Sequence, residues 1–380
     1  MKKFLFILIL GAFCCSQISR AQPTVIDKKI TDIMQKYQAI GLSVAVIKNN
    51  KLIFSNSYGL KNIEENQALQ NDDIFRIASI SKSFSATAIM QLIEQKKCHL
   101  DDDFSDLIGF KIRNPNFPNT KITLRMILSH TSSINDKNGY FDLEVINPTH
   151  SDQYINSYSN YEPGTKYAYC NLNFNMIGAV IERLSGQRFD LYIKEHILDP
   201  LQLYAGYCVD SLDKNKFVTL YEYDRDKSGF RPQTSAYNPR SLEIKNYTLG
   251  HSTPVFSPTG GMKISAVDLA KYMGMHMNYG KGFNGQQIIK KSSSKIMQTP
   301  ITPDEGYGLA LRSTDQLVPH KTLIGHTGSA YGLYSAMFFD PRAKFGIVVI
   351  TNGCRVPEYT NFNPFLKDCI QLIYQEMIEN

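Results

Sequence analysis

The segment FRIASISK at residues 75–82 decides the fold. Ser79 and Lys82 stand three positions apart in it, directly before an apolar run that includes Phe84, Ala88 and Leu92. At the start of a helix, positions i and i+3 lie on the same face, so the lysine amine points back at the serine hydroxyl. The free N–H groups of the first turn can stabilise negative charge. The spacing therefore predicts a nucleophile and its base on one element.

The Ser-x-x-Lys spacing alone is a weak signal. It occurs at Ser79/Lys82, Ser211/Lys214 and Ser292/Lys295. The second copy lies in a polar stretch and the third in a run of lysines and serines, so both are expected to be solvated. Only Lys82 sits in apolar surroundings that would desolvate its amine and lower its pKa. The alternative is that Ser79 merely caps a helix and Lys82 is a surface charge.

Composition narrows the functional classes. The chain has 380 residues, 43% of them hydrophobic and 20% charged, which is enough for one large domain or two moderate ones. It has no Lys/Arg-rich run with interleaved aromatics, so nucleic-acid binding is not predicted. Without a Cys-x-x-Cys, His-x-x-His or His-Glu-x-x-His pattern, neither a metal site nor a cofactor is predicted.

The N-terminus is expected to be a secretory signal peptide. Two lysines precede the apolar run at residues 4–13, and the small residues Ser19 and Ala21 then suit a cleavage site before Gln22. The mature chain is thus expected in the periplasm or secreted, with no transmembrane segment. Lipid attachment at Cys14 is a weaker alternative, because bulky Phe13 precedes it.

Hydrophobic periodicity predicts an α+β fold whose sheet uses both ends of the chain. The expected helices are residues 25–37, 83–95, 123–128, 172–184, 266–277 and one from about 362; the expected strands are 42–47, 51–58, 307–311, 335–339 and 345–351. The catalytic domain would then be residues 22–380. Its sheet part would span about 22–78 and 301–380, and its helical part about 79–300.

Further motifs follow the first in a fixed order. Residues 75–82 resemble the first motif of the serine β-lactamase-related family, and residues 122–132 resemble the helix and turn that come next. The triplet at 169–171, preceded by Pro-Gly-Thr at 163–165, resembles the Y-x-N motif, and His-Thr-Gly at 326–328 resembles the third motif. Other Y-x-N copies begin at Tyr154, Tyr158 and Tyr359 without these surroundings. The resemblance implies a β-lactamase/DD-peptidase-like fold.

The resemblance also implies a role for each motif residue. Ser79, Lys82 and Tyr169 would be catalytic, and the backbone N–H groups of Ser79 and Ser329 would form the oxyanion hole. Asn171, His326 and Thr327 would contact the substrate. A lysine ammonium beside a buried tyrosine lowers the pKa of the tyrosine hydroxyl, so Tyr169 is expected to be proton-poor and to take the proton of Ser79.

Two positions depart from class C β-lactamases. Cys170 fills the middle of Y-x-N and is expected to be a packed, unreactive thiol. His326 replaces the lysine of the third motif. A histidine has an ordinary pKa of about 6.5 and is mostly neutral at pH 7, so it should capture a β-lactam carboxylate less well than lysine.

These observations predict an exported serine hydrolase or acyltransferase that acts through an acyl-enzyme on Ser79. The acyl donor would be a small-molecule or peptide ester or amide, and the acceptor water or a hydrophobic alcohol or amine. Aromatic stretches at 154–169 and 221–237 could hold such an acceptor. The first alternative is a β-lactamase or D-Ala-D-Ala carboxypeptidase, and the second a non-catalytic penicillin-binding-like module. An α/β-hydrolase lacks support, because no Gly-x-Ser-x-Gly occurs.

Overall fold

The computed structural model describes residues 24–302 and 304–379. The expected signal peptide at residues 1–21 lies outside them. Among the described residues, no helix combines the length and apolar character that a membrane span requires.

Within the described residues, the main sheet has seven antiparallel strands in the order β3-β2-β1-β12-β11-β10-β9. The strands are β1 (Gly41–Lys48), β2 (Lys51–Asn62), β3 (Gln67–Ala68), β9 (Arg312–Val318), β10 (Lys321–Ala330), β11 (Leu333–Asp340) and β12 (Phe345–Thr351). The N-terminal β1 pairs with the C-terminal β12 along its length. The predicted α+β fold with a sheet from both chain ends is therefore confirmed.

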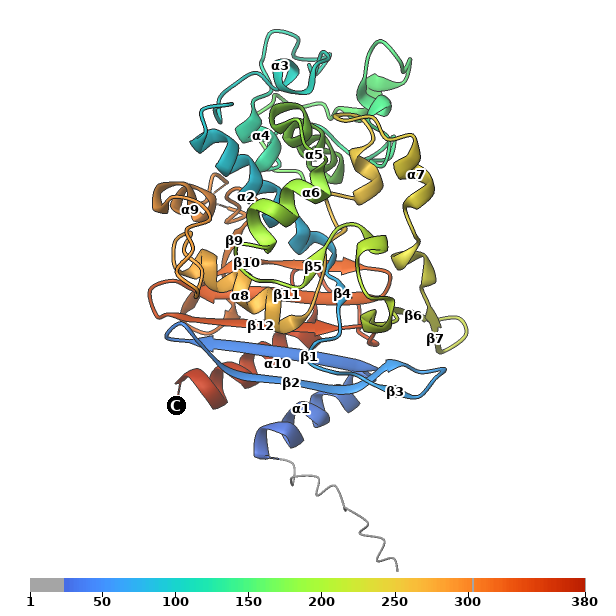
Figure 1. The fold of residues 1–380 in the computed structure, drawn as a ribbon, viewed down its shortest axis with the longest axis vertical. Helices are drawn as coiled ribbons and strands as arrows, with labels where there is room; N and C mark the ends of the chain where they lie inside the picture. The colour runs from blue at the N-terminus through green and yellow to red at the C-terminus, as the bar shows by residue number, and fades with distance from the viewer. Residues whose placement is uncertain (1–23, 303, 380) are drawn as a thin grey trace, which may run out of the picture.

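Helices cover both faces of this sheet. Helices α1 (Val25–Lys36) and α10 (Pro364–Tyr374) pack on one face, and α8 (Ala266–Met277) packs on the other, toward the helical part of the molecule (Figure 1). Successive strand side chains point to opposite faces, so Val44 and Val46 join the core with α1 and α10. Ala45 and Ile47 join the larger core on the opposite face.

The helical part surrounds a buried central helix. Its elements are α2 (Ser81–Glu94), α3 (Phe104–Ile108), α4 (Leu124–Leu128), α5 (Asn171–Ser185), α6 (Phe189–Ile193), α7 (Ser241–Lys245) and α9 (Lys291–Gln298). Helix α2 is buried from Ser81 to Leu92 and packs against α5. This region also contains strands, which the expectation of a mostly helical middle omitted: β5 (Ala205–Gly206), β6 (Tyr221–Asp224), β7 (Gly229–Pro232) and β8 (Lys263–Ile264). Strand β8 pairs with β5 and with β4 (Phe75–Arg76), which precedes the nucleophile.

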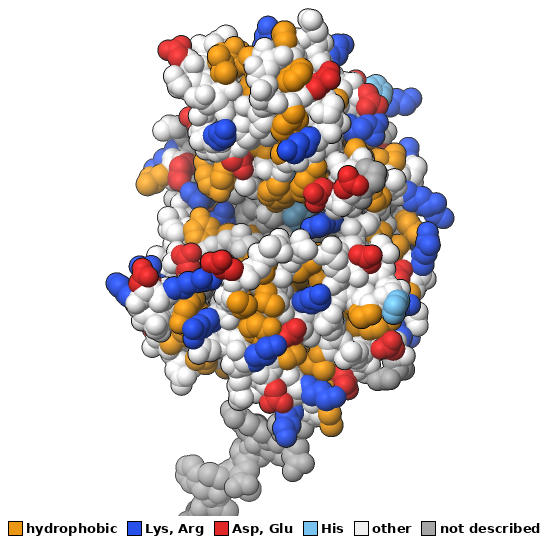
Figure 2. Space-filling model, turned by 180° about the vertical axis from the view of Figure 1, so that it is seen from behind, with side chains coloured by type: hydrophobic (Ala, Val, Ile, Leu, Met, Phe, Trp, Pro, Cys, Tyr) orange, Lys and Arg blue, Asp and Glu red, His pale blue; other side chains and the backbone are white. Residues whose placement is uncertain are grey.

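The strand predicted at residues 307–311 is wrong. Ala310 has a φ of 57°, which is incompatible with extended backbone, and β9 begins only at Arg312. The next strand, β10, was not predicted from periodicity, although it carries the third motif. The space-filling view shows a hollow between the helical and sheet parts, with hydrophobic side chains at its edge and a histidine inside (Figure 2).

Candidate active site

The nucleophile lies on a tight turn rather than within a helix. Ser79 is in the 3-10 turn η1 (Ala78–Ile80), which runs directly into α2. Ala78 has a φ of 50°, in the left-handed region that non-glycine residues rarely occupy. Strand β10 presses against this turn: a Cβ at Gly328 would lie 2.2 Å from the carbonyl oxygen of Ile77. Only a glycine lets the strand approach the nucleophile so closely.

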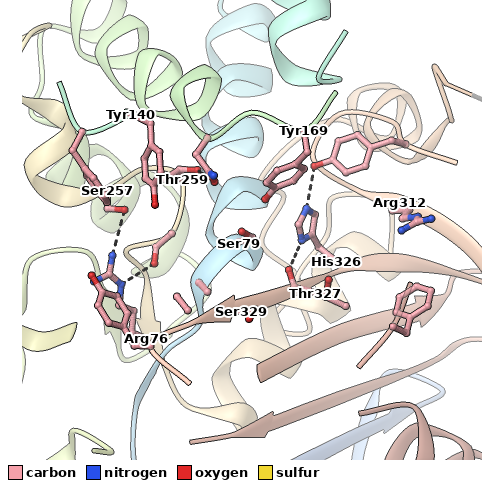
Figure 3. Close-up of a pocket in the computed structure, with 18 of the residues that line it drawn as sticks. Arg76, Ser79, Tyr140, Tyr169, Ser257, Thr259, Arg312, His326, Thr327 and Ser329 are labelled. Carbon is pink, nitrogen blue, oxygen red and sulfur yellow. Dashed lines mark hydrogen bonds between the residues drawn. The ribbon is translucent and has the colours of Figure 1, made fainter. Parts of the chain in front are cut away.

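A cavity of about 750 Å³ opens at this contact. Its lining includes six of the seven residues named from the sequence: Ser79, Tyr169, Asn171, His326, Thr327 and Ser329. Figure 3 shows Tyr169, His326 and Arg312 on one side of Ser79 and Arg76, Ser257 and Tyr140 on the other. The seventh, Lys82, is fully buried beneath. The serines and lysines of the other two Ser-x-x-Lys copies are all exposed.

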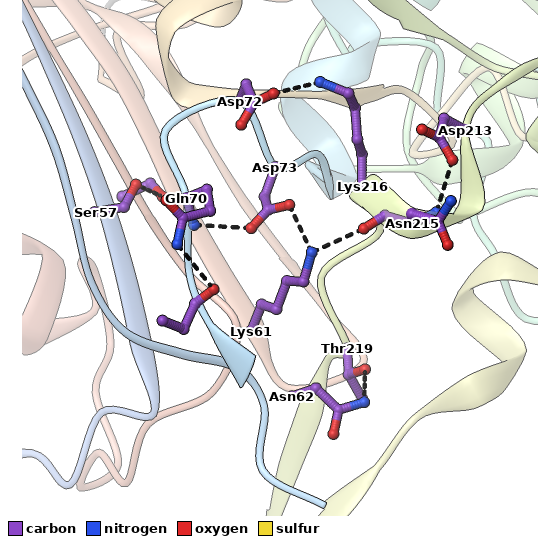
Figure 4. A network of polar contacts seen from close by, with 12 residues as sticks. Ser57, Lys61, Asn62, Gln70, Asp72, Asp73, Asp213, Asn215, Lys216 and Thr219 are labelled. Carbon is purple, nitrogen blue, oxygen red and sulfur yellow. Dashed lines mark hydrogen bonds and ion pairs between the residues drawn. The ribbon is translucent and has the colours of Figure 1, made fainter. Parts of the chain in front are cut away.

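A polar network holds the segment that leads to the nucleophile (Figure 4). Lys61 on β2 donates to Asp73 Oδ1 at 2.9 Å and to the carbonyl oxygen of Asn215 at 2.8 Å. Lys216 pairs with Asp72. These contacts tie residues 72–73, just before β4, to a neighbouring strand and loop. They fix where the chain enters the active-site turn.

The amine of Lys82 has three neighbours. Its Nζ lies 3.1 Å from Ser79 Oγ, 3.0 Å from Asn171 Oδ1 and 2.9 Å from the carbonyl oxygen of Thr259. The amide and carbonyl oxygens can only accept hydrogen bonds. An ammonium can donate to all three oxygens, and a neutral amine can donate to these two acceptors while its lone pair accepts the Ser79 hydroxyl proton. Only the neutral amine can act as the base for Ser79.

Electrostatics favour the same assignment. Burial lowers the pKa of Lys82 to about 7, while the negative charge of Asp136 opposes this change. Burial raises the pKa of Tyr169, and its contact with Ser79 only partly offsets the rise. These directions run against the expectation of a proton-poor Tyr169: burial disfavours both charged forms, which favours a neutral Lys82 beside a Tyr169 that keeps its proton.

This order of titration predicts an acid-side loss of activity. Above pH 7 Lys82 is neutral and can accept the Ser79 proton, whereas below it the amine is protonated. We expect kcat/KM for a neutral ester to be flat above about pH 7 and to fall about tenfold per pH unit below it. Rates measured from about pH 5 to about pH 9 check this. Re-assay at pH 8 after incubation at each pH controls for unfolding. A limb near the ordinary pKa of lysine would contradict it.

Asp136 is a site residue that the sequence motifs did not reveal. Its carboxylate accepts hydrogen bonds from the backbone N–H groups of Asn171 (2.8 Å) and Leu172 (2.9 Å) at the start of α5. It also accepts from Asn171 Nδ2 at 2.9 Å and from the Cys170 thiol at 3.2 Å. The bond to Nδ2 turns Asn171 Oδ1 toward Lys82. Asp136 thus positions the second motif against the first.

We expect Asp136→Asn to move the acid limb of the pH profile of kcat/KM to lower pH, by about half a pH unit to one pH unit. The reason is that the negative charge of Asp136 raises the pKa of Lys82, and the substitution removes it. Asparagine also accepts fewer of the N–H groups at the helix start, so Tm should fall. The matched control is Asp142→Asn, since Asp142 caps a turn in the same loop without lining the cavity. An unchanged limb would show that Asp136 acts only on stability.

His326 forms the opposite wall as a neutral side chain. Its Nδ1–H donates to the carbonyl oxygen of Thr327 at 2.5 Å, and its Nε2 accepts from the Tyr307 hydroxyl at 3.0 Å. Burial, with Lys82 nearby, lowers the pKa of His326 to about 3. This direction agrees with the neutral charge expected from the sequence. However, Arg312 lines the same cavity, so a cation is present at this end that the motif did not predict.

Two further groups support the second motif. His130 is buried, accepts from the Cys170 N–H at 3.2 Å and packs its ring 4.3 Å from the Tyr169 ring. Burial holds the pKa of His130 well below its ordinary value, so it is a neutral platform for Tyr169. Cys170 is the packed thiol expected: it is buried, and burial raises its pKa well above the ordinary value. All five cysteines in the described residues are unpaired.

Of the two aromatic stretches, only the first contributes to the cavity, through Tyr167 and Tyr169. Most of the aromatic lining comes from elsewhere: Tyr140, Phe141, Tyr307, Tyr331, Phe338 and Phe362. Within the described residues, no group of three or more His, Cys, Asp or Glu side chains is placed to hold a metal ion.

Known proteins resemble this chain in sequence. Protein flp of Staphylococcus aureus (strain MW2) is 24% identical over 343 residues, covering 86% of this chain and 62% of the relative. The chain thus spans less than two thirds of that relative. Penicillin-binding protein 4 of Amycolatopsis lactamdurans is 24% identical over 303 residues, covering 75% of this chain and 74% of the relative.

Solved structures share the fold. The octameric penicillin-binding protein homologue from Pyrococcus abyssi superposes with a TM-score of 0.73 at 25% identity, over 92% of this chain and 76% of that one. EstCE1, described as a hydrolase with promiscuous acyltransferase activity, gives a TM-score of 0.72 at 18% identity, over 92% of this chain and 98% of that one. Residues 26–366 of this chain match the model of the β-lactamase family. The chain therefore belongs to the β-lactamase family, the group of serine hydrolases to which its three motifs pointed.

Proposed function

We propose that this protein is an exported serine hydrolase or acyltransferase that forms an acyl-enzyme on Ser79. The observation that carries the proposal is the contact between Ser79 Oγ and the buried Lys82 amine at 3.1 Å, beside a cavity of about 750 Å³. Export rests on the sequence of residues 1–21 and would place the enzyme in the periplasm or outside the cell.

Acylation begins with proton transfer. Neutral Lys82 takes the hydroxyl proton of Ser79, and Ser79 Oγ forms a bond to the carbonyl carbon of the donor. The oxyanion that results faces the backbone N–H groups of Ser79 and Ser329. Tyr169, which keeps its own proton, donates it to the leaving oxygen or nitrogen as that bond breaks. The proton that Lys82 took from Ser79 then passes to Tyr169, leaving an ester on Ser79, a neutral lysine and a protonated tyrosine.

Deacylation repeats these steps with a new nucleophile. Water, an alcohol or an amine enters from the leaving-group side, loses its proton to the Lys82 and Tyr169 pair, and takes the acyl group. A bound acceptor has already lost its translational freedom, which gives it an advantage over bulk water. The aromatic lining offers an apolar surface for a hydrophobic acceptor. The activity reported in the name of EstCE1 is consistent with such transfer.

The test is to incubate the purified chain with aryl esters, nitrocefin and D-Ala-D-Ala peptides while measuring donor consumption and free acid together. Ester turnover that depends on Ser79 supports the proposal, and acylated product formed from added hydrophobic alcohols or amines establishes transfer. Free acid equal to donor consumed in every case would leave hydrolysis alone. Fast nitrocefin or peptide turnover would instead identify a β-lactamase or carboxypeptidase. No turnover and no covalent adduct would identify a non-catalytic module.

A further inference from the structure

Arg76 lies at the end of the cavity away from His326 (Figure 3). It is only 6% exposed, yet its side chain lines the cavity. It comes from β4, three residues before the nucleophile, so the same short segment carries both groups. This fixes the guanidinium relative to Ser79.

All the hydrogen-bond partners of this guanidinium are neutral. Nε donates to the carbonyl oxygen of Gly260 at 3.0 Å, while the contacts to the Ala236 carbonyl (3.5 Å) and Ser257 Oγ (3.4 Å) are long. The Tyr331 ring lies against the guanidinium at 4.9 Å. Among residues 24–302 and 304–379, no Asp or Glu forms an ion pair with Arg76. The charge is therefore held without an internal anion.

The charged groups close to Arg76 are also cations, so they do not balance its charge. Arg240 repels Arg76 and is itself paired with Glu243 at 3.0 Å. Lys263 is buried, and both burial and Arg76 lower its pKa. A guanidinium cannot relieve the conflict by losing its proton. Burying a charge without a partner is costly, so an anion that enters the cavity at this end would be stabilised.

We propose that Arg76 binds a carboxylate on the acyl half of the donor, so that the enzyme prefers acyl groups with a free acid at their far end. This rests on the proposed function. Tyr169 lies on the opposite side of Ser79 and protonates the leaving group there, so the acyl half extends toward Arg76, Ser257 and Tyr140 (Figure 3). One guanidinium matches the single charge and planar shape of a carboxylate, with which its N–H groups can pair bidentately.

The test compares two 4-nitrophenyl esters of equal chain length, the hexanoate and the monoester of adipate, which carries the free carboxylate. Hydrolysis by Ser79→Ala enzyme is subtracted as background. We expect kcat/KM for adipate to exceed that for hexanoate by about 10- to 100-fold, mainly through KM, and high salt to reduce this preference. Arg76→Gln should lower kcat/KM for adipate much more than for hexanoate, and so remove the preference. Arg76→Lys should retain part of it.

The matched control is Arg240→Gln, which removes a neighbouring cation that does not line the cavity and should leave the preference unchanged. A third ester, 3-carboxyphenyl butyrate, places the acid on the leaving group and should be insensitive to Arg76→Gln. Equal wild-type turnover of hexanoate and adipate overturns the inference, as does an equal loss for both esters in Arg76→Gln. If Arg76→Gln fails to fold, the wild-type preference, its salt dependence and Arg76→Lys decide. Inactivity toward every ester would instead refute the proposed function.

Discussion

Ser79→Ala is expected to lower kcat/KM for aryl esters by about 10⁴- to 10⁶-fold and to abolish covalent labelling by a fluorophosphonate probe. The reason is that Ser79 Oγ lies 3.1 Å from the buried amine of Lys82. Among the described residues, no other hydroxyl of the cavity lies at hydrogen-bond distance from a buried lysine amine. Steady-state kinetics measure the first effect. Intact-protein mass spectrometry, followed by peptide mapping, measures the second.

The chain supplies its own controls for this experiment. Ser211→Ala and Ser292→Ala remove the serines of the other two Ser-x-x-Lys copies, both of which are exposed to solvent. Each should retain full activity and full labelling. An adduct on Ser211 or Ser292, or a Ser79→Ala enzyme that still turns over esters at the wild-type rate, would refute the assignment of the nucleophile.

The sequence predicted those features that depend on local pattern. Helices α5 and α8 have long apolar faces, and strand β12 is an unbroken apolar run, so each was found close to its observed bounds. The motif residues were found because chemistry restricts their spacing. Their meeting at one cavity follows from the fold rather than from the pattern.

Strand β10 escaped prediction for a physical reason. Its side chains do not alternate cleanly between buried and exposed, and it includes Gly325 and Gly328, which weaken any strand signal. At Gly328 the side chain is absent because the strand must approach the nucleophile turn. The close approach of this strand to the nucleophile requires a glycine, and that glycine interrupts the alternating pattern by which a strand is identified. The apolar residues 309–311 imitated a strand because their burial comes from core packing.

Proton order and charge placement could not be predicted because they depend on distant contacts. Burial lowers the pKa of Lys82, and the contacts of its amine with Asn171 and Thr259 come from segments far away in sequence. Asp136 lies outside the sequence motifs. Arg76 lies within the first motif, but the sequence does not show that its guanidinium lines the cavity. Only the three-dimensional arrangement reveals these roles.

The second large effect concerns the proton-transfer pair. We expect Lys82→Ala and Tyr169→Phe each to lower kcat/KM by about 10²- to 10⁴-fold, and the double variant to be little worse than the weaker single variant. The Lys82 Nζ lies 4.7 Å from the centre of the Tyr169 ring, and both side chains contact Ser79. Once either is missing, the proton has no complete path, so removing the other costs little more.

The four enzymes of this double-mutant cycle are compared by kcat/KM on one neutral ester, at a pH where wild-type Lys82 is neutral. Tyr167→Phe is the matched control: it removes a phenol hydroxyl from the same cavity without contact to Ser79, and should cost less than about fivefold. Losses that multiply would mean that the lysine and the tyrosine act independently. The pair is expected to behave as one unit, because Tyr169 retains its proton and must recover it from Lys82 after each half-reaction.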